Sequence, residues 1–176
     1  GPECVSFIPV SSMRAIPSWV DKVHDRDKNE QCIYDLTFRP DGSQLIVAAG
    51  QRVLVYDVSD GALIQPLKGH KDTVYCVDYA KDGKRFASGS GDKSVIIWTE
   101  KLEGILKYSH NDAIQCLSYN PLTHSLASCA NSDFGLWSSE QKCVQKHKVP
   151  SRINRCAWSP DGRFLALGLS SGIIKK

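Results

Sequence analysis

Short apolar segments alternate with turn residues along most of this chain. In the stretch from residue 69 to 110, apolar-rich segments occupy residues 73–79, 85–90, 95–98 and 105–108, and Gly, Asp, Lys and Ser fill the gaps. Segments of this length and composition, bounded by such turn residues, predict β-strands. The run 95–98 contains no polar position, which is typical of a strand buried on both faces. We therefore expect residues 69–110 to form one four-stranded antiparallel sheet.

The same arrangement recurs along the chain. An aromatic residue leads into a turn at Phe38, Tyr79, Tyr119 and Trp158, at steps of 41, 40 and 39 residues. A second aromatic follows at Tyr56, Trp98 and Trp137, and a histidine precedes each later block at His70, His110 and His147. A period near 40 residues with four strands per repeat predicts the blades of a β-propeller. A generic antiparallel sandwich is the alternative, but sandwiches do not repeat their turn residues in register.

The repeats set the expected boundaries. The predicted class is an all-β, incomplete β-propeller at residues 13–176, with three blades and most of a fourth. The blades are expected near 31–70, 71–110, 111–149 and 150–176. A full propeller of this period has about seven blades and on the order of 280 residues. We therefore interpret the chain as a piece of a longer propeller or an alternative product.

Finer predictions follow from the same pattern. Residues 1–12 are interpreted as a non-native or upstream leader, because Gly1-Pro2 is typical of a tag-protease scar and the native-like sequence is expected to begin at Met13. Residues 21–30 are charged and lack an apolar period, so we expect a loop or a short helical turn. The third strands of the first three blades are predicted near 52–57, 94–99 and 134–138.

Four residues of the second block could satisfy one another's hydrogen bonds: His70, Ser88, Asp92 and Trp98. A buried indole N–H needs an acceptor, and a hydroxyl, an imidazole and a carboxylate can complete such a network. With the Gly-His and Trp anchors, this pattern resembles the WD-repeat family, in which these residue types form a hydrogen-bonded network within a blade.

The resemblance extends unevenly to the other blocks. It implies a related network at His110, Ser128 and Trp137, although the third block is one residue shorter and its turn at 131–133 does not place the Asp unambiguously. The first block has Tyr56 in place of the Trp and no Asp in its turn, so no full network is expected there.

Longer unbroken runs of matching residues point to one group within the WD-repeat family. Residues 67–76, 80–89, 93–98 and 132–137 are similar to the amino-terminal propeller of a family of WD-repeat subunits of intraflagellar transport complex A. The resemblance implies a non-catalytic scaffold in retrograde ciliary transport, ciliary entry of membrane proteins and cilium assembly. Its implied partners are other complex A subunits and ciliary cargo proteins, and its implied location is the cytoplasm, the cilium and the ciliary base. A WD-repeat substrate receptor of a ubiquitin-ligase complex is the alternative function.

The expected protein-binding surface is one end of the propeller. Loops on rigid scaffolds are frequent binding sites, and the loops before each first strand gather there with the turns at 90–93 and 131–133. The candidate contact residues are Lys71, Asp72, Asn111 and Asp112.

Other classes of function are disfavoured. The formal net charge is only +3 and the basic residues are spread without interleaved aromatics, so nucleic-acid binding is not expected. No run approaches the roughly 18 apolar residues of a membrane-spanning helix. His70, Ser88 and Asp92 offer the residue types of a catalytic triad, but equivalent positions recur in the next block, which favours a structural role. We expect neither an enzyme nor a bound cofactor.

Cysteine usage indicates a reducing compartment. The seven cysteines (4, 32, 76, 116, 129, 143 and 156) include no Cys-x-x-Cys pair and no Cys-His cluster, so a metal site is not expected. Cys76, Cys116 and Cys156 occupy the same position of successive first strands. This recurrence is typical of small buried apolar residues.

Overall fold

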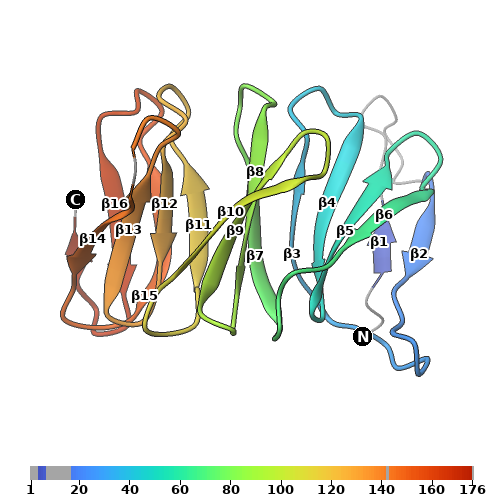
Figure 1. Cartoon of the computed structure of the whole chain (residues 1–176), viewed down its shortest axis with the longest axis horizontal. Helices are drawn as coiled ribbons and strands as arrows, with labels where there is room; N and C mark the ends of the chain where they lie inside the picture. The colour runs from blue at the N-terminus through green and yellow to red at the C-terminus, as the bar shows by residue number, and fades with distance from the viewer. Residues whose placement is uncertain (1–3, 7–16, 142, 176) are drawn as a thin grey trace.

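Four antiparallel sheets stand side by side in chain order in the computed structural model, which describes residues 4–6, 17–141 and 143–175 (Figure 1). The first sheet contains β3 (Ile33–Phe38), β4 (Gln44–Ala49), β5 (Arg52–Asp57) and β6 (Leu63–Leu67). The second contains β7 (Val74–Tyr79), β8 (Arg85–Ser90), β9 (Ser94–Thr99) and β10 (Gly104–Ser109). The third contains β11 (Cys116–Tyr119), β12 (Leu126–Cys129), β13 (Asp133–Trp137) and β14 (Gln145–Lys148). The fourth contains β15 (Ile153–Trp158), β16 (Leu165–Leu169) and β17 (Ile174–Lys175).

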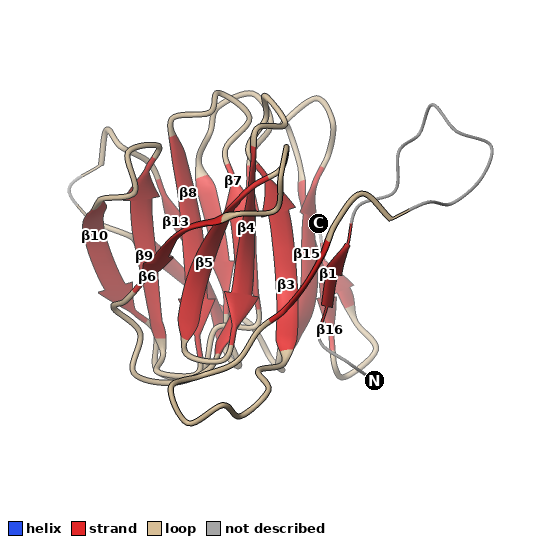
Figure 2. Ribbon diagram, turned by 90° about the vertical axis from the view of Figure 1, so that its right-hand side faces the viewer, coloured by secondary structure: helices blue, strands red, loops and turns tan. Residues whose placement is uncertain are grey.

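The predicted fold class is confirmed. All described elements are strands (Figure 2), and the sheets do not close into a ring. The third strands β5 and β9 fall at the predicted residues, and β13 begins one residue earlier than predicted. Among the described residues, no helix has the length and apolar character needed to cross a bilayer.

The hydrophobic core lies between the sheets rather than within one layer. Ile46 and Val53 of the first sheet pack with Val74, Phe86 and Trp98 of the second. Similar clusters join the second sheet to the third and the third to the fourth. Strands β4, β8, β9 and β12 are therefore covered on both faces. This burial explains the mostly apolar sequences of β4, β9 and β12 and the small residues of β8.

Close packing between sheets requires a glycine in β8. A Cβ atom built on Gly89 would lie 2.5 Å from Ile114 Cγ2 and 2.7 Å from Cys76 Sγ. Any larger residue at this position would push the second and third sheets apart. The loop before β11 thus reaches the second blade only because position 89 has no side chain.

The segment before the first blade is folded against it. Its strand β2 (Val20–Lys22) pairs with β1 (Cys4–Ser6), Trp19 stacks on Tyr56 at 5.8 Å between ring centroids, and the Trp19 indole donates to the Val58 carbonyl at 2.8 Å. Residues 1–3 and 7–12 of the predicted leader lie outside the described residues.

Residues 21–30, predicted as a loop or a short helical turn, form part of β2 and a tight turn closed by a bridge between His24 and Glu30. The Asp25 carboxylate accepts hydrogen bonds from the backbone N–H groups of Asp27 and Asn29, both at 2.9 Å. This local capping explains how a segment without apolar periodicity becomes ordered.

Candidate protein-binding face

A buried hydrogen-bond network lies inside the second blade. His70 Nε2 is 2.7 Å from Ser88 Oγ, and the Trp98 indole donates to the same hydroxyl oxygen at 2.9 Å. His70 Nδ1 lies 3.2 Å from Asp92 Oδ2. All four residues predicted for this network are therefore connected.

The Asp92 carboxylate ties the network to the surface loop. It accepts hydrogen bonds from Ser94 Oγ at 2.6 Å, from the Ser94 N–H at 2.9 Å and from the Lys71 N–H at 2.9 Å. Partial burial raises the pKa of Asp92, but the hydrogen bonds and the nearby His70 outweigh it and hold the pKa well below its usual value. Asp92 thus remains ionised and fixes the backbone of Lys71.

The histidine of this network is held in its neutral form. Burial lowers the pKa of His70, and the attraction of Asp92 only partly offsets that effect. A neutral imidazole has one N–H to donate and one lone pair to accept, which suits a ring placed between a carboxylate and a hydroxyl. This bonding explains the histidine without a catalytic role.

In the third blade, a histidine makes the same two contacts, to a serine and to an aspartate, but a different aromatic residue bonds to the serine. His110 Nε2 is 2.8 Å from Ser128 Oγ, and His110 Nδ1 is 2.8 Å from Asp133 Oδ1. Asp133 thus fills the carboxylate position that the shorter turn left ambiguous. The hydroxyl of Tyr108, rather than the Trp137 indole, donates to Ser128 at 2.9 Å.

Trp137 is buried but lies outside this hydrogen-bonded group. The Arg85 guanidinium sits over its ring, 5.9 Å from the centroid. In the first blade, the Tyr56 hydroxyl donates instead to Asp21 Oδ2 at 2.8 Å, so this residue contacts the segment before the blade.

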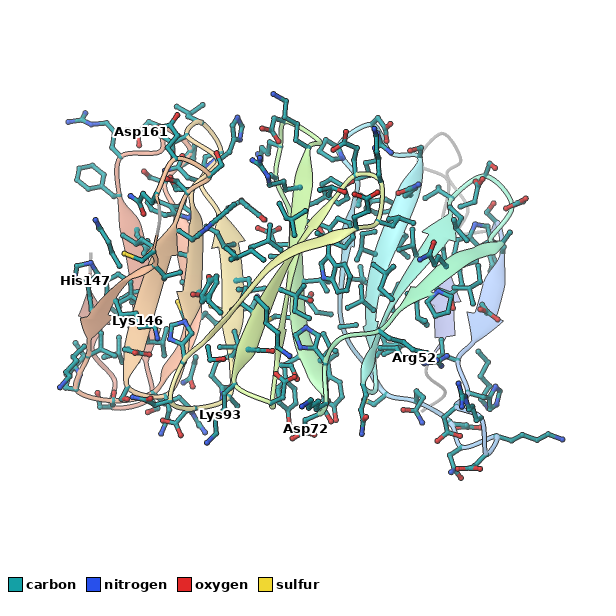
Figure 3. All side chains as sticks on the ribbon, in the orientation of Figure 1. Arg52, Asp72, Lys93, Lys146, His147 and Asp161 are labelled. Atoms are coloured by element: carbon teal, nitrogen blue, oxygen red, sulfur yellow. The ribbon has the colours of Figure 1, made fainter. Side chains whose placement is uncertain are left out.

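The loops of the candidate face gather at one edge of the array. Figure 3 places Asp72 and Lys93 together at this edge and Asp161 at the opposite edge. Backbone hydrogen bonds join the loops: Gly91 N–H donates to the Thr73 carbonyl at 2.8 Å, and His110 N–H donates to the Lys93 carbonyl at 2.9 Å. Lys71, Asp72, Lys93 and Asn111 are exposed there, and Asp112 is half-buried.

Hydrogen bonds link the loops at the centre of the face. Asp72 caps the following strand by accepting from the Thr73 N–H at 2.7 Å, and Ser90 Oγ donates to the Asp72 carbonyl at 3.0 Å. In the neighbouring turn, Lys93 has a positive φ of 75° and its side chain is exposed. The exposed charges therefore stand on loops that the Asp92 network holds in place.

The structure also brings together three cysteines that sequence spacing did not group. The Sγ atoms of Cys116, Cys129 and Cys156 all lie within 4.8 Å of one another. The sequence did contain one signal for this cluster, because Cys116 and Cys156 occupy the same position in successive repeats. The third member depends on cross-strand pairing, which the spacing alone does not reveal.

Comparison with known proteins identifies close relatives. Residues 32–176 match the model of the IFT122 first beta-propeller. The chain is 76% identical over 162 residues to the intraflagellar transport protein 122 homolog of Danio rerio and 71% identical to that of Homo sapiens. Each match covers 92% of this chain but only 14% and 13% of the respective relatives. A WD repeat, SAM and U-box domain-containing protein of Danio rerio is 31% identical over 64% of this chain and 24% of its own length.

Proposed function

Because the chain belongs to the family of the IFT122 first beta-propeller, we propose that it serves as a non-catalytic scaffold within intraflagellar transport complex A. In this role it binds other complex A subunits and ciliary cargo proteins. It acts in retrograde ciliary transport, in ciliary entry of membrane proteins and in cilium assembly. Its expected location is the cilium, the ciliary base and the cytoplasm.

The observation that carries the proposal is the 71–76% identity to intraflagellar transport protein 122 homologs across nearly the whole chain. The arrangement of the histidine networks agrees with a scaffold. Their imidazoles, hydroxyls and carboxylates bond to one another inside the blades instead of converging on an open cleft. The exposed face formed by Lys71, Asp72, Lys93, Asn111 and Asp112 is the proposed contact surface.

The test is a charge reversal on this face in the longest protein that the gene encodes. A Lys71→Glu/Asp72→Lys double variant keeps the net charge and reverses the charge pattern presented to a partner. It also removes the bond from the Thr73 N–H to Asp72, and the control below loses the matching bond from the Lys84 N–H to Asp82. We expect reduced recovery of complex A subunits or ciliary cargo from ciliated cells, with little change in melting temperature. The matched control is Lys81→Glu/Asp82→Lys, which alters the same exposed dipeptide in the β7–β8 turn at the opposite edge.

Two outcomes would contradict the proposal in different ways. If both double variants recover complex A subunits normally, the contact surface lies elsewhere, for example on the blade edges. If the unmodified protein recovers no transport subunits and instead recovers a ubiquitin ligase, the scaffold assignment is wrong and the substrate-receptor alternative replaces it.

A further inference from the structure

Three thiols meet at the junction of the third and fourth blades. Cys116 and Cys129 are directly opposed in the antiparallel pair β11–β12, and Cys156 comes from β15 of the next sheet. The Cys116 thiol contacts Cys156 Sγ at 2.9 Å, and all three sulfur atoms lie within 4.8 Å of one another. The cluster therefore connects two separate sheets.

Within the part of the chain that the structure describes, such a cluster forms at this junction alone, and one residue position explains the difference. The residue that pairs with the first-strand cysteine is Gly89 opposite Cys76 in the second blade, Cys129 opposite Cys116 in the third and Leu167 opposite Cys156 in the fourth. Repeated use of cysteine as a small core residue explains positions 76, 116 and 156. It does not explain why Cys129 places a third sulfur next to those of Cys116 and Cys156.

The donor set points to a particular kind of ligand. Thiolates are soft ligands that select Cu(I), Zn(II) or iron–sulfur clusters. Structural Zn(II) sites are almost always tetrahedral with four protein ligands. Among the described residues, no His, Asp or Glu side chain completes this group of three sulfur atoms. Three sulfur donors without a fourth protein ligand suit a three-coordinate Cu(I) ion better than either alternative.

The surroundings provide both shielding and access. Cys129 is fully buried, Cys116 is 9% exposed and Cys156 is half-buried. Cys116 and Cys156 both line a cavity of about 250 Å³. Arg155, Asp35 and Asp78 line the same cavity. An ion can thus enter from this cavity beside Cys116 and Cys156 and be enclosed by the buried Cys129 sulfur.

We propose that Cys116, Cys129 and Cys156 form a three-thiolate site for Cu(I) that links the third blade to the fourth. On binding, each ligating thiol forms a Cu–S bond and releases its proton to solvent, so the copper remains monovalent. Because the ligands come from two sheets, the bound ion also stabilises their packing. This site does not depend on the proposed scaffold function.

The test is a competition titration. The full 176-residue chain, reduced and freed of metal without oxygen, is added to Cu(I) held by the chromophoric chelator bicinchoninate. We expect the chain to withdraw about one Cu(I) ion, X-ray absorption at the copper edge to show three sulfur neighbours, and the melting temperature to rise. The absorption measurement uses the unmodified chain, so it remains informative if a variant fails to fold.

Matched variants assign the ligands. Cys129→Ala and Cys156→Ala should each weaken Cu(I) binding by at least about tenfold, the loss that follows even from disturbing groups behind a metal ligand. Cys76→Ala is the control, since Cys76 is buried at the equivalent position of β7 but lies outside the cluster. Far-UV circular dichroism should show the same strand content in all three variants.

Four results would overturn the proposal. They are unchanged Cu(I) binding in Cys129→Ala, loss of binding in Cys76→Ala, retention of Zn(II) but not Cu(I), and formation of a Cys116–Cys156 disulfide without retained copper. The last of these would identify the pair as a redox couple instead of a metal site.

Discussion

Asp92 is the residue that joins the core of the second blade to the exposed loop. Its carboxylate bonds to His70 on the buried side and to the Lys71 backbone N–H on the exposed side. The side chain of Asp92 is only 10% exposed, so water cannot readily replace these bonds. Asp92 thus anchors the loop of the candidate face to the core of the blade.

Replacing Asp92 with Ala should therefore destabilise the protein by about 1–3 kcal/mol, because the buried donors of His70 and Ser94 lose their acceptor and the backbone N–H of Lys71 loses its anchor. Urea unfolding of the two proteins measures the difference. Asp41→Ala is the control, since Asp41 makes the same two bonds to Ser43 in an exposed turn that water can satisfy. Equal losses from the two substitutions would contradict a structural role for the Asp92 network.

Neighbouring blades are also linked by carboxylates near the inner strands. Asp35 of β3 accepts from the Val77 N–H of β7 at 3.1 Å, and Asp78 of β7 accepts from the Tyr119 N–H of β11 at 2.7 Å. Burial raises the pKa of Asp78 to about 6, although the bonds from Tyr119 and Tyr79 oppose the rise. At neutral pH the folded protein therefore carries a poorly solvated charge at this link.

Asp78→Asn should stabilise the protein at pH 7, because it keeps an oxygen acceptor for Tyr119 and removes the buried charge. An unfolded aspartate has a pKa of about 3.9, so the raised folded value corresponds to on the order of 2–3 kcal/mol at pH 7. The carboxyl group prefers its proton in the folded state, so the cost disappears as pH falls from about 7 to about 4. Unfolding measured across this range should show the advantage of Asn shrinking with acidification.

The control for this pH effect is Asp161→Asn. Asp161 is exposed, and the hydrogen bonds from Ser159 and the Arg163 N–H lower its pKa. Its substitution should therefore be neutral or slightly destabilising at pH 7. An Asp78→Asn variant that is less stable than the wild type at pH 7 would show that the ionised carboxylate strengthens the link between blades.

The strands were more predictable than the contacts between them. Apolar runs such as 95–98 located β9 because a strand buried on both faces needs no polar position. The sequence did not predict that Tyr108, instead of Trp137, donates a hydrogen bond to Ser128, because Tyr108 belongs to an outer strand of the preceding blade. The cysteine cluster likewise depends on the β11–β12 register and on packing between sheets. Local periodicity carries information about strands but not about which side chains meet across blades.

At the scale of the whole molecule, the two ends of the array expose surfaces that the inner blades cover. Leu36 is 47% exposed in β3, whereas the equivalent Val77 and Leu117 are 4% and 9% exposed in β7 and β11. At the other end, Ile174 is 82% exposed. In repeat proteins each unit is stabilised by its neighbours, so the outer sheets are the least stable.

We therefore expect the isolated chain to be marginally stable and prone to associate through its exposed ends. Fusing it to the residues that follow the matching segment in the Danio rerio relative should raise the melting temperature, because additional blades would cover the fourth sheet. Calorimetry at several protein concentrations, with sedimentation to detect association, provides the measurement. A control fusion to an unrelated soluble domain of equal length should leave the melting temperature unchanged. A sharp two-state transition of the isolated monomer that is independent of concentration would instead show that the open array is self-sufficient.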